Sequence, residues 1–235
     1  MKIAVLFDGA GLARLGLEQA GHRCVGVELD PCKHYLSSFV GKGECVLSDA
    51  QTFSLSGFDA VWASPPCQIR SQARTQGAPR SRYAVDLVDW ALAIPSDILW
   101  VENVISDGQQ FGKVYNATQF HTPPIQIRNR VIGGSYLPPE VHRPYARACN
   151  GVCPAITATE YRGCASDRRR ASRFYGRKLT LEECAYHQGF SIPNEWKEPP
   201  PWFAGTLVSW RNQQYEAIGN GVPVYMARAF GAAYK

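Results

Sequence analysis

The chain has 235 residues, of which 45% are hydrophobic and 19% are charged, and its formal net charge is +5. This length and composition are typical of one globular domain with a small additional lobe, and there is no low-complexity tract or internal repeat. The apolar opening at 1–7 is too short for a signal peptide, and no apolar run approaches transmembrane length. We therefore expect a cytoplasmic protein without membrane contact, whose eight cysteines stay reduced.

The first half of the chain alternates apolar runs with segments of helical spacing. The apolar runs predict buried strands at 3–7, 24–27, 44–47, 58–63 and 98–101. The helical spacing predicts helices at 12–20, 31–40 and 82–93. Because strands alternate with helices, we predict an α/β fold with an open, mostly parallel, Rossmann-like sheet and helices on both faces.

The second half of the chain is less regular. Residues 134–176 are rich in Pro, Gly and Arg and show no periodic pattern. A helix is predicted at 179–188, with Thr180 as its N-cap. The last segment, 213–234, is predicted to return to the sheet as a helix associated with a turn at 219–221.

Polar or glycine-rich residues follow every predicted strand. In chain order they are Asp8, Gly9 and Gly11, then Glu28, then Asp49, then Pro66 and Cys67, and finally Glu102. The carboxyl ends of parallel strands share one edge of the sheet, where α/β folds bind ligands. These residues therefore predict a binding site at that edge.

The first three strand ends favour a nucleoside ligand. Gly9 and Gly11 would let the backbone approach the ligand closely, and Glu28 could accept both hydroxyls of a ribose. Asp49 could meet an adenine amino group. Each acid could instead be a solvated loop residue or a helix cap, but two acids after a glycine turn favour the nucleoside. Arg14 stands where a dinucleotide fingerprint has its third glycine, which disfavours NAD.

The next two strand ends carry candidate catalytic groups. Cys67 follows two prolines that stiffen the backbone, and it is either a buried thiol in a rigid turn or a nucleophile. Glu102 is a candidate proton donor. Further along, Arg128 and Arg130 share one side of an extended segment and form a pair suited to a phosphate or a base carbonyl.

A basic segment lies between residues 162 and 178, where seven Arg and Lys residues face one acid and aromatic residues are interleaved. Such a run is often a solvated loop, but its density and single sign favour binding to a polyanion. Cys149 and Cys153 have a loosely metal-like spacing. No matching Cys or His pair lies nearby, so we expect no metal site.

Taken in order, these blocks resemble the motifs of the cytosine-C5 DNA methyltransferases. The matching blocks are Phe7-Asp8-Gly9-Ala10-Gly11, Glu28, Asp49, Pro65-Pro66-Cys67-Gln68, Glu102-Asn103-Val104, Gln126-x-Arg128-x-Arg130, Arg177-Lys178-Leu179-Thr180 and Gly219-Asn220-Gly221-Val222-Pro223. The resemblance extends over nearly the whole chain and implies a methyltransferase fold of the Rossmann type.

This resemblance implies methylation of cytosine at C5 in double-stranded DNA, with S-adenosylmethionine as the donor. Cys67 would attack C6 of a flipped cytosine, Glu102 would bind N3, and Arg128 and Arg130 would hold the base and its phosphate. The implied cofactor residues are Phe7, Gly9, Gly11, Glu28, Asp49, Pro66, Asn220 and Val222. The implied DNA-binding residues are Gln68, Arg70, Ser71, Arg162, Arg168, Arg169, Arg170 and Arg173.

The chain departs from the family in two respects. Asp8 stands where the family has a small residue, so a carboxylate is expected beside the donor's sulfonium, and a modified one-carbon donor is an alternative. The target-recognition region is also short. We expect a catalytic domain at 1–130 and 177–235 and a reduced recognition lobe at 131–176. Base reading would then be minimal, with phosphate contacts dominating.

Two other functions stay open at this point. The same chemistry could act on tRNA, since tRNA methyltransferases can share these motifs. A catalytically inactive DNA-binding protein that shields sites is the alternative of another class, which intact Cys67, Glu102 and Arg128 disfavour. We expect a monomer in a bacterial or phage-infected cell, of the kind that acts in restriction–modification.

Overall fold

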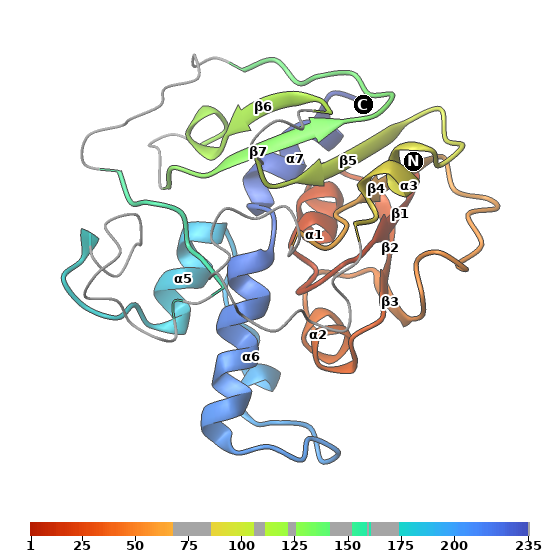
Figure 1. The fold of residues 1–235 in the computed structure, drawn as a ribbon. Helices are drawn as coiled ribbons and strands as arrows, with labels where there is room; N and C mark the ends of the chain where they lie inside the picture. The colour runs from red at the N-terminus through yellow and green to blue at the C-terminus, as the bar shows by residue number, and fades with distance from the viewer. Residues whose placement is uncertain are drawn as a thin grey trace.

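The computed structural model describes residues 1–67, 86–105, 111–121, 126–141, 152–158, 160 and 174–234. The core of these residues is a seven-stranded sheet with the order β3-β2-β1-β4-β5-β7-β6 (Figure 1). Its strands are β1 (Lys2–Leu6), β2 (Arg23–Glu28), β3 (Glu44–Leu47), β4 (Ala60–Ala63), β5 (Leu99–Asn103), β6 (Lys113–Asn116) and β7 (Asn129–Gly133).

Most of this sheet is parallel, as the sequence predicts. β1 pairs in parallel with β2 and β4, and the parallel part extends to β3 on one side and to β5 on the other. β7 pairs antiparallel with β5, and β6 pairs antiparallel with β7. The sequence predicted only an extended segment near 126–130, because β6 and β7 are short and contain polar residues.

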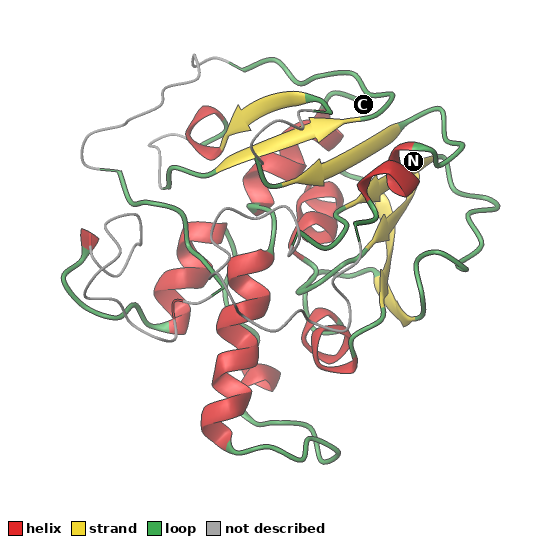
Figure 2. Ribbon diagram, in the orientation of Figure 1, coloured by secondary structure: helices red, strands yellow, loops and turns green. Residues whose placement is uncertain are grey.

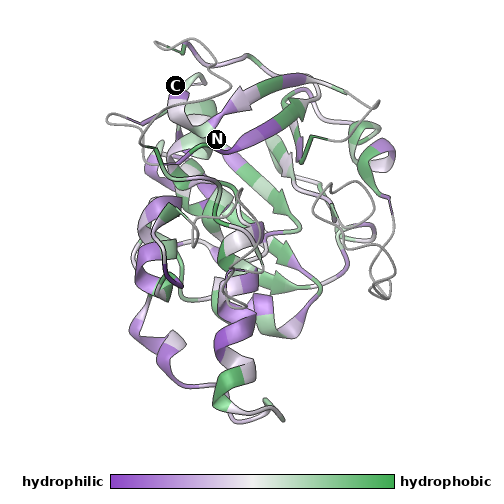
Figure 3. Ribbon diagram, turned by 60° about the vertical axis from the view of Figure 1, so that its left-hand side comes forward, coloured by the Kyte–Doolittle hydropathy of each residue, from purple (hydrophilic) through white to green (hydrophobic). Residues whose placement is uncertain are grey.

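Helices cover both faces of the sheet, which confirms the predicted architecture. Ile3 and Val5 of β1 share a core with α1 (Leu12–Gln19) and α7 (Val224–Ala232). The intervening Ala4 and Leu6 point to the other face and share a core with α3 (Val88–Leu92). Figure 3 shows hydrophobic residues along the strands and hydrophilic ones on the outer helices. Burial on both faces explains why the central strands are continuous apolar runs.

The remaining described helices are α2 (Pro31–Ser37), α5 (Leu181–Gln188), α6 (Leu207–Asn220) and the short 3₁₀ helices Ala117–Gln119 and Asn194–Lys197. Among them, α2 connects β2 to β3 and packs against both strands. Figure 2 shows α5 and α6 packed next to one another. Thr180 caps α5 as predicted, because its side chain accepts from the backbone of Glu183 while the Glu183 carboxylate accepts from the backbone of Thr180.

The C-terminal segment differs from the prediction. α6 continues through Gly219 and Asn220, which were predicted as a turn, and α7 begins only after Pro223. Because proline has no N–H to continue the helical hydrogen bonds, the chain leaves α6 at Gly221 and starts a second helix. Gly219 packs so tightly that a Cβ there would lie 2.2 Å from the carbonyl carbon of Thr157.

Several predictions fall on ranges that are described only in part. The predicted helix 82–93 is described from residue 86 and is helical over Val88–Leu92. The predicted domain boundary at 130 falls inside β7, but the domain division itself stays a prediction. No helix in the described ranges has the length and apolar character needed to cross a membrane. The described residues also contain no group of three or more His, Cys, Asp or Glu side chains arranged to hold a metal ion.

Gly16 sets how closely α1 and α7 approach one another. A Cβ at this position would lie 2.3 Å from the carbonyl oxygen of Val224 and 2.8 Å from the backbone nitrogen of Arg228. We predict that Gly16→Ala lowers the free energy of unfolding by about 1–3 kcal/mol, the usual cost of overpacking. Denaturant unfolding measures this, with the exposed Gln19→Ala on the same helix as control. Equal stability of Gly16→Ala and the wild type would contradict this packing.

Candidate functional site

A cavity of about 500 Å³ opens where the carboxyl ends of β1, β2, β4 and β5 meet the end of α6. Every residue predicted as catalytic or cofactor-binding lines it, with the exception of Gly11. These lining residues are Phe7, Gly9, Glu28, Asp49, Pro66, Cys67, Glu102, Arg128, Arg130, Asn220 and Val222. The topology of the sheet therefore brings together residues that are far apart in the sequence, while their individual roles stay predictions.

Glu28 organises one end of the cavity. Its Oε2 accepts from the backbone N–H of Gly9 at 2.8 Å, and its Oε1 accepts from those of Leu29 and Asp30 at 2.9 Å each. Burial raises the pKa of Glu28, and the charge of Lys33 and the backbone hydrogen bonds from Asp30 and Gly9 act against that rise. Glu28 thus ties the turn after β1 to the end of β2.

The turn after β1 has an unusual backbone. Phe7 has a φ of +60°, a left-handed conformation that is uncommon for a residue other than glycine. Its ring, which lines the cavity, meets the ring of Trp90 edge-on at 6.0 Å between centroids. Gly9 follows with a φ of +59°, and the N–H of Gly11 donates to the carbonyl of Asp8 at 2.8 Å. This tight turn places Phe7 and Gly9 on the cavity wall.

The loop that carries Cys67 is held by its neighbour strand. The side-chain amide of Asn103 donates to the carbonyl of Pro65 at 3.0 Å, and the indole of Trp62 donates to the Ser64 hydroxyl at 2.9 Å. Asn103 directly follows Glu102 and is buried. It was not predicted as a site residue, although its place in the Glu102-Asn103-Val104 block was the available signal.

The thiol of Cys67 lies among charged groups. Burial raises the pKa of Cys67, the charge of Arg130 lowers it, and the charge of Glu102 raises it. Glu102 and Arg130 form an ion pair of 2.7 Å between Oε1 and Nε. The resting group is therefore a protonated thiol near neutral pH, with a cation beside it that favours the thiolate.

Arg128 was predicted to hold the base or its phosphate, and in the structure its guanidinium is hydrogen-bonded to backbone carbonyls around the cavity. Its Nη1 donates to the carbonyl of Ile156, and its Nη2 donates to those of Gly219 at 2.6 Å and Gly221 at 3.0 Å. Burial, followed by the charge of Arg130, lowers the pKa of Arg128 well below its usual range. Its Nε is buried without a partner. Arg128 thus lines the cavity while it holds together the backbone around it.

Two glutamines link the end of α6, which Arg128 contacts, to α5. Gln126 donates to the carbonyl of His187 at 2.5 Å and to the side-chain oxygen of Gln188 at 2.9 Å. Gln188 in turn donates to the carbonyls of Ile218 at 2.6 Å and Gly221 at 3.1 Å. These amides satisfy carbonyls that the ends of α5 and α6 leave without helical partners. The sequence analysis did not assign them a role.

Lys33 is a further cavity residue that the sequence analysis missed. It lies on α2, lines the cavity and places its charge near Glu28. Nothing in its sequence surroundings distinguishes it from a solvated lysine. All predicted DNA-binding residues lie outside the described residues, namely Gln68, Arg70, Ser71, Arg162, Arg168, Arg169, Arg170 and Arg173.

Comparison with known families agrees with this site. Residues 1–106 match the family described as C-5 cytosine-specific DNA methylase, which confirms the resemblance seen in the sequence. The matched part contains Phe7, Glu28, Asp49, Cys67 and Glu102. A search of curated proteins finds no match to the chain.

Solved structures share the fold at low identity. The Dnmt2 methyltransferase of S. pombe aligns with a TM-score of 0.57 and 14% identity, over 97% of this chain and 96% of that chain. A protein described as a DNA modification methyltransferase encoded within an E. coli prophage gives 0.57 and 14%, over 99% and 98%. The Entamoeba histolytica methyltransferase EhMeth gives 0.59 and 14%, over 100% and 98%. These likenesses confirm the Rossmann-like methyltransferase fold.

The ion pair beside Cys67 gives a testable pH dependence. In Arg130→Gln the cation that lowers the pKa of Cys67 is absent, while the charge of Glu102, which raises it, remains. Alkylation by iodoacetamide requires the thiolate, so the midpoint, the pH at which half of Cys67 reacts, follows the pKa of its thiol. In the wild type this pH should lie above the ordinary range of a cysteine, and in Arg130→Gln it should be higher still. Mass spectrometry of the Cys67 peptide across a pH series measures both midpoints. Arg177→Gln, at an exposed site, is the control. A midpoint that falls in Arg130→Gln would contradict the prediction.

Proposed function

We propose that the chain is a cytosine-C5 methyltransferase that acts on double-stranded DNA and takes its methyl group from S-adenosylmethionine. One observation carries the proposal. A single cavity is lined by Cys67, by the Glu102–Arg130 ion pair and by the buried carboxylate of Glu28. The family that residues 1–106 match is described by its action on DNA, which supports DNA over RNA.

The cavity end around Glu28 fits a nucleoside donor. Glu28 supplies a buried carboxylate for the ribose hydroxyls, Phe7 supplies an aromatic ring and Asp49 an acceptor for the adenine amino group. The donor contributes a methyl group on a positively charged sulfur. Asp8 lines the cavity, but its Oδ2 is paired with Arg14 at 2.9 Å, and this pairing argues against a modified donor.

In the proposed reaction the protein activates the base covalently. Cys67 loses its proton, and its sulfur forms a bond to C6 of the flipped cytosine. Glu102, oriented by Arg130, takes up the proton from Cys67 and donates it in a hydrogen bond to N3, so electron density moves to C5, which accepts the methyl group. A base then removes the C5 proton, the ring double bond forms again and the C6–S bond breaks. Cys67 is released as a thiolate, which Arg130 stabilises.

Covalent trapping tests both the chemistry and the nucleic acid. A 5-fluorocytosine has no C5 proton to remove, so the adduct between Cys67 and C6 should persist on fluorinated duplex DNA with donor present. We expect a band shift in a denaturing gel for the wild type and for Cys32→Ala, which removes a half-buried thiol outside the site, but none for Cys67→Ala. An adduct on fluorinated tRNA alone would replace DNA by RNA in the proposal. No Cys67-dependent adduct on either would favour an inactive binding protein.

Binding of S-adenosylhomocysteine tests the donor site without turnover. Glu28→Ala removes the acceptor of both ribose hydroxyls, and the loss of hydrogen bonds to a charged group should weaken binding by about 10- to 100-fold. Glu28→Gln, which keeps one acceptor oxygen, should lie between the wild type and Glu28→Ala. Isothermal titration calorimetry measures all three, with the exposed Glu195→Ala as control. Unchanged affinity in Glu28→Ala would contradict the placement of Glu28.

A further inference from the structure

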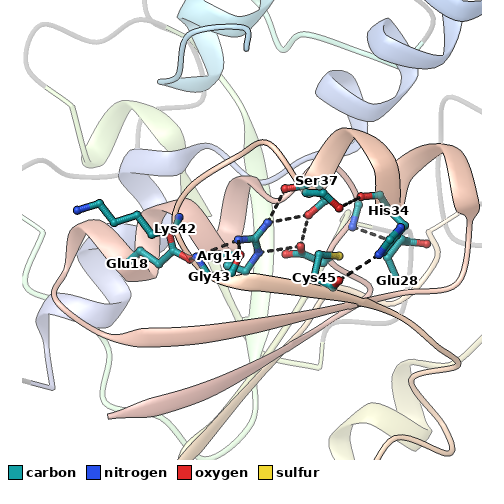
Figure 4. Close-up of polar contacts among 11 residues, drawn as sticks. Arg14, Glu18, Glu28, His34, Ser37, Lys42, Gly43 and Cys45 are labelled. Carbon is teal, nitrogen blue, oxygen red and sulfur yellow. Dashed lines mark hydrogen bonds and ion pairs between the residues drawn. The ribbon is translucent and has the colours of Figure 1, made fainter. Parts of the chain in front are cut away.

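A buried polar network lies beneath the turn that forms one end of the cavity (Figure 4). The Nε of Arg14 donates to Oδ2 of Asp8 at 2.9 Å, and the hydroxyl of Ser37 donates to the same oxygen. Arg14 also donates through Nη2 to the hydroxyl of Ser37 at 2.8 Å and to its carbonyl at 2.7 Å. The side chains of Asp8 and Arg14 are fully buried.

Arg14 connects this network to a second loop. Its Nη1 donates to the carbonyl of Gly43 at 2.6 Å, and Figure 4 shows its guanidinium between Ser37 of α2 and Gly43. Glu18, one turn along α1, accepts from the backbone N–H groups of Lys42 and Gly43 at 2.8 Å each. The network therefore joins the turn after β1, the end of α2 and the loop that leads into β3.

Arg14 stays charged in this network. Burial acts to lower the pKa of Arg14, but the charge of Asp8 and its hydrogen bond outweigh burial and raise it. A buried ion pair holds its partners in a narrow geometry, since any displacement leaves a buried charge without compensation.

Two glycines leave space for the side chains of this network. A Cβ on Gly26 of β2 would lie 2.2 Å from Oδ2 of Asp8. A Cβ on Gly11 would lie 2.9 Å from both Nη2 of Arg14 and the hydroxyl of Ser37. Gly11 was predicted to bring the backbone close to a ligand, but it does not line the cavity. Its lack of a side chain makes room for the network instead.

Asp8 lies between Phe7 and Gly9 in the turn, and all three residues line the cavity. Phe7 before it has the left-handed φ of +60°, and the N–H of Gly9 after it is held by Glu28. Fixing the Asp8 side chain from the interior therefore fixes both neighbours, while Glu28 fixes the turn from the cavity side.

We propose that Asp8, Arg14 and Ser37 are positioning residues that hold the turn from Phe7 to Gly9 in the geometry that receives the donor's adenosine. This inference rests on the proposed donor site. The network would act on donor affinity, and the cytosine chemistry at Cys67 would not depend on it.

The test separates positioning from stability. Asp8→Ala leaves Arg14 charged and unpaired and is expected to fold poorly, so the double variant Asp8→Ala/Arg14→Leu, which removes both charges, carries the test. Ser37→Ala removes only the hydroxyl that links Asp8 to α2. The matched control is Asp59→Asn, because that carboxylate accepts from the N–H of Lys2 at 2.6 Å, at the opposite end of β1.

The measurements are the dissociation constant of S-adenosylhomocysteine by calorimetry, the KM for donor, the KM for nucleic acid and kcat. We expect donor KM and the dissociation constant to rise about tenfold in the double variant and about threefold in Ser37→Ala, with kcat and the nucleic-acid KM within about twofold. The control should match the wild type.

Two outcomes would overturn the inference in distinguishable ways. If the wild type binds S-adenosylhomocysteine and the double variant and Ser37→Ala bind it equally well, with only a lower melting temperature, the network stabilises the fold and does not position the turn. If the double variant fails to fold, Ser37→Ala alone provides the test, and unchanged binding of S-adenosylhomocysteine in Ser37→Ala would overturn the inference. A wild type that does not bind S-adenosylhomocysteine would overturn the proposed donor site, and the inference with it.

Discussion

The guanidinium of Arg128 joins three distant parts of the chain around one cavity. It donates to the carbonyls of Ile156, Gly219 and Gly221, and it directly precedes the strand that carries Arg130. The carbonyls at the end of a helix carry partial negative charge and have no helical partners, so a buried cation is a favourable donor to them. The end of α6 is thereby held at a fixed position relative to the catalytic groups. Without Arg128, buried carbonyls would lose their partners and this wall of the cavity would be free to move.

Four buried ionisable side chains of the site form two ion pairs. Asp8 pairs with Arg14 beneath the turn, and Glu102 pairs with Arg130 beside Cys67. Removing one member of such a pair typically costs about 3–5 kcal/mol, because a charge is left unpaired in the interior. Cys67 lies beside the second pair, where burial raises the pKa of its thiol, the charge of Arg130 lowers it and the charge of Glu102 raises it. The two members of the pair therefore act on the thiol in opposite directions.

The sequence predicted most of the sheet, and nearly all of the residues that it assigned to catalysis or to the cofactor line the cavity, because both follow from general rules. Parallel strands are continuous apolar runs, and their carboxyl ends meet at one edge, which places Glu28, Cys67 and Glu102 together. The sequence did not reveal the partners of Asp8, because Arg14 and Ser37 lie 6 and 29 residues away and only the fold brings them near. The break between α6 and α7 was misplaced for a similar reason. It depends on Pro223 and on tertiary hydrogen bonds to Gly221, which no local pattern reveals.

The segment with the predicted DNA-binding arginines is tied to the catalytic core on both sides in the chain. Before it, Ile156 is fully buried with α5 and α6, and its carbonyl accepts from Arg128. After it, the hydroxyl of Tyr175 lies 2.9 Å from Nε2 of His187 on α5. The chain positions on either side of this segment are therefore both held by described residues, Ile156 by Arg128 and Tyr175 by His187 of α5. Because Arg128 and Ile156 both line the cavity, the first of these contacts is part of the cavity wall.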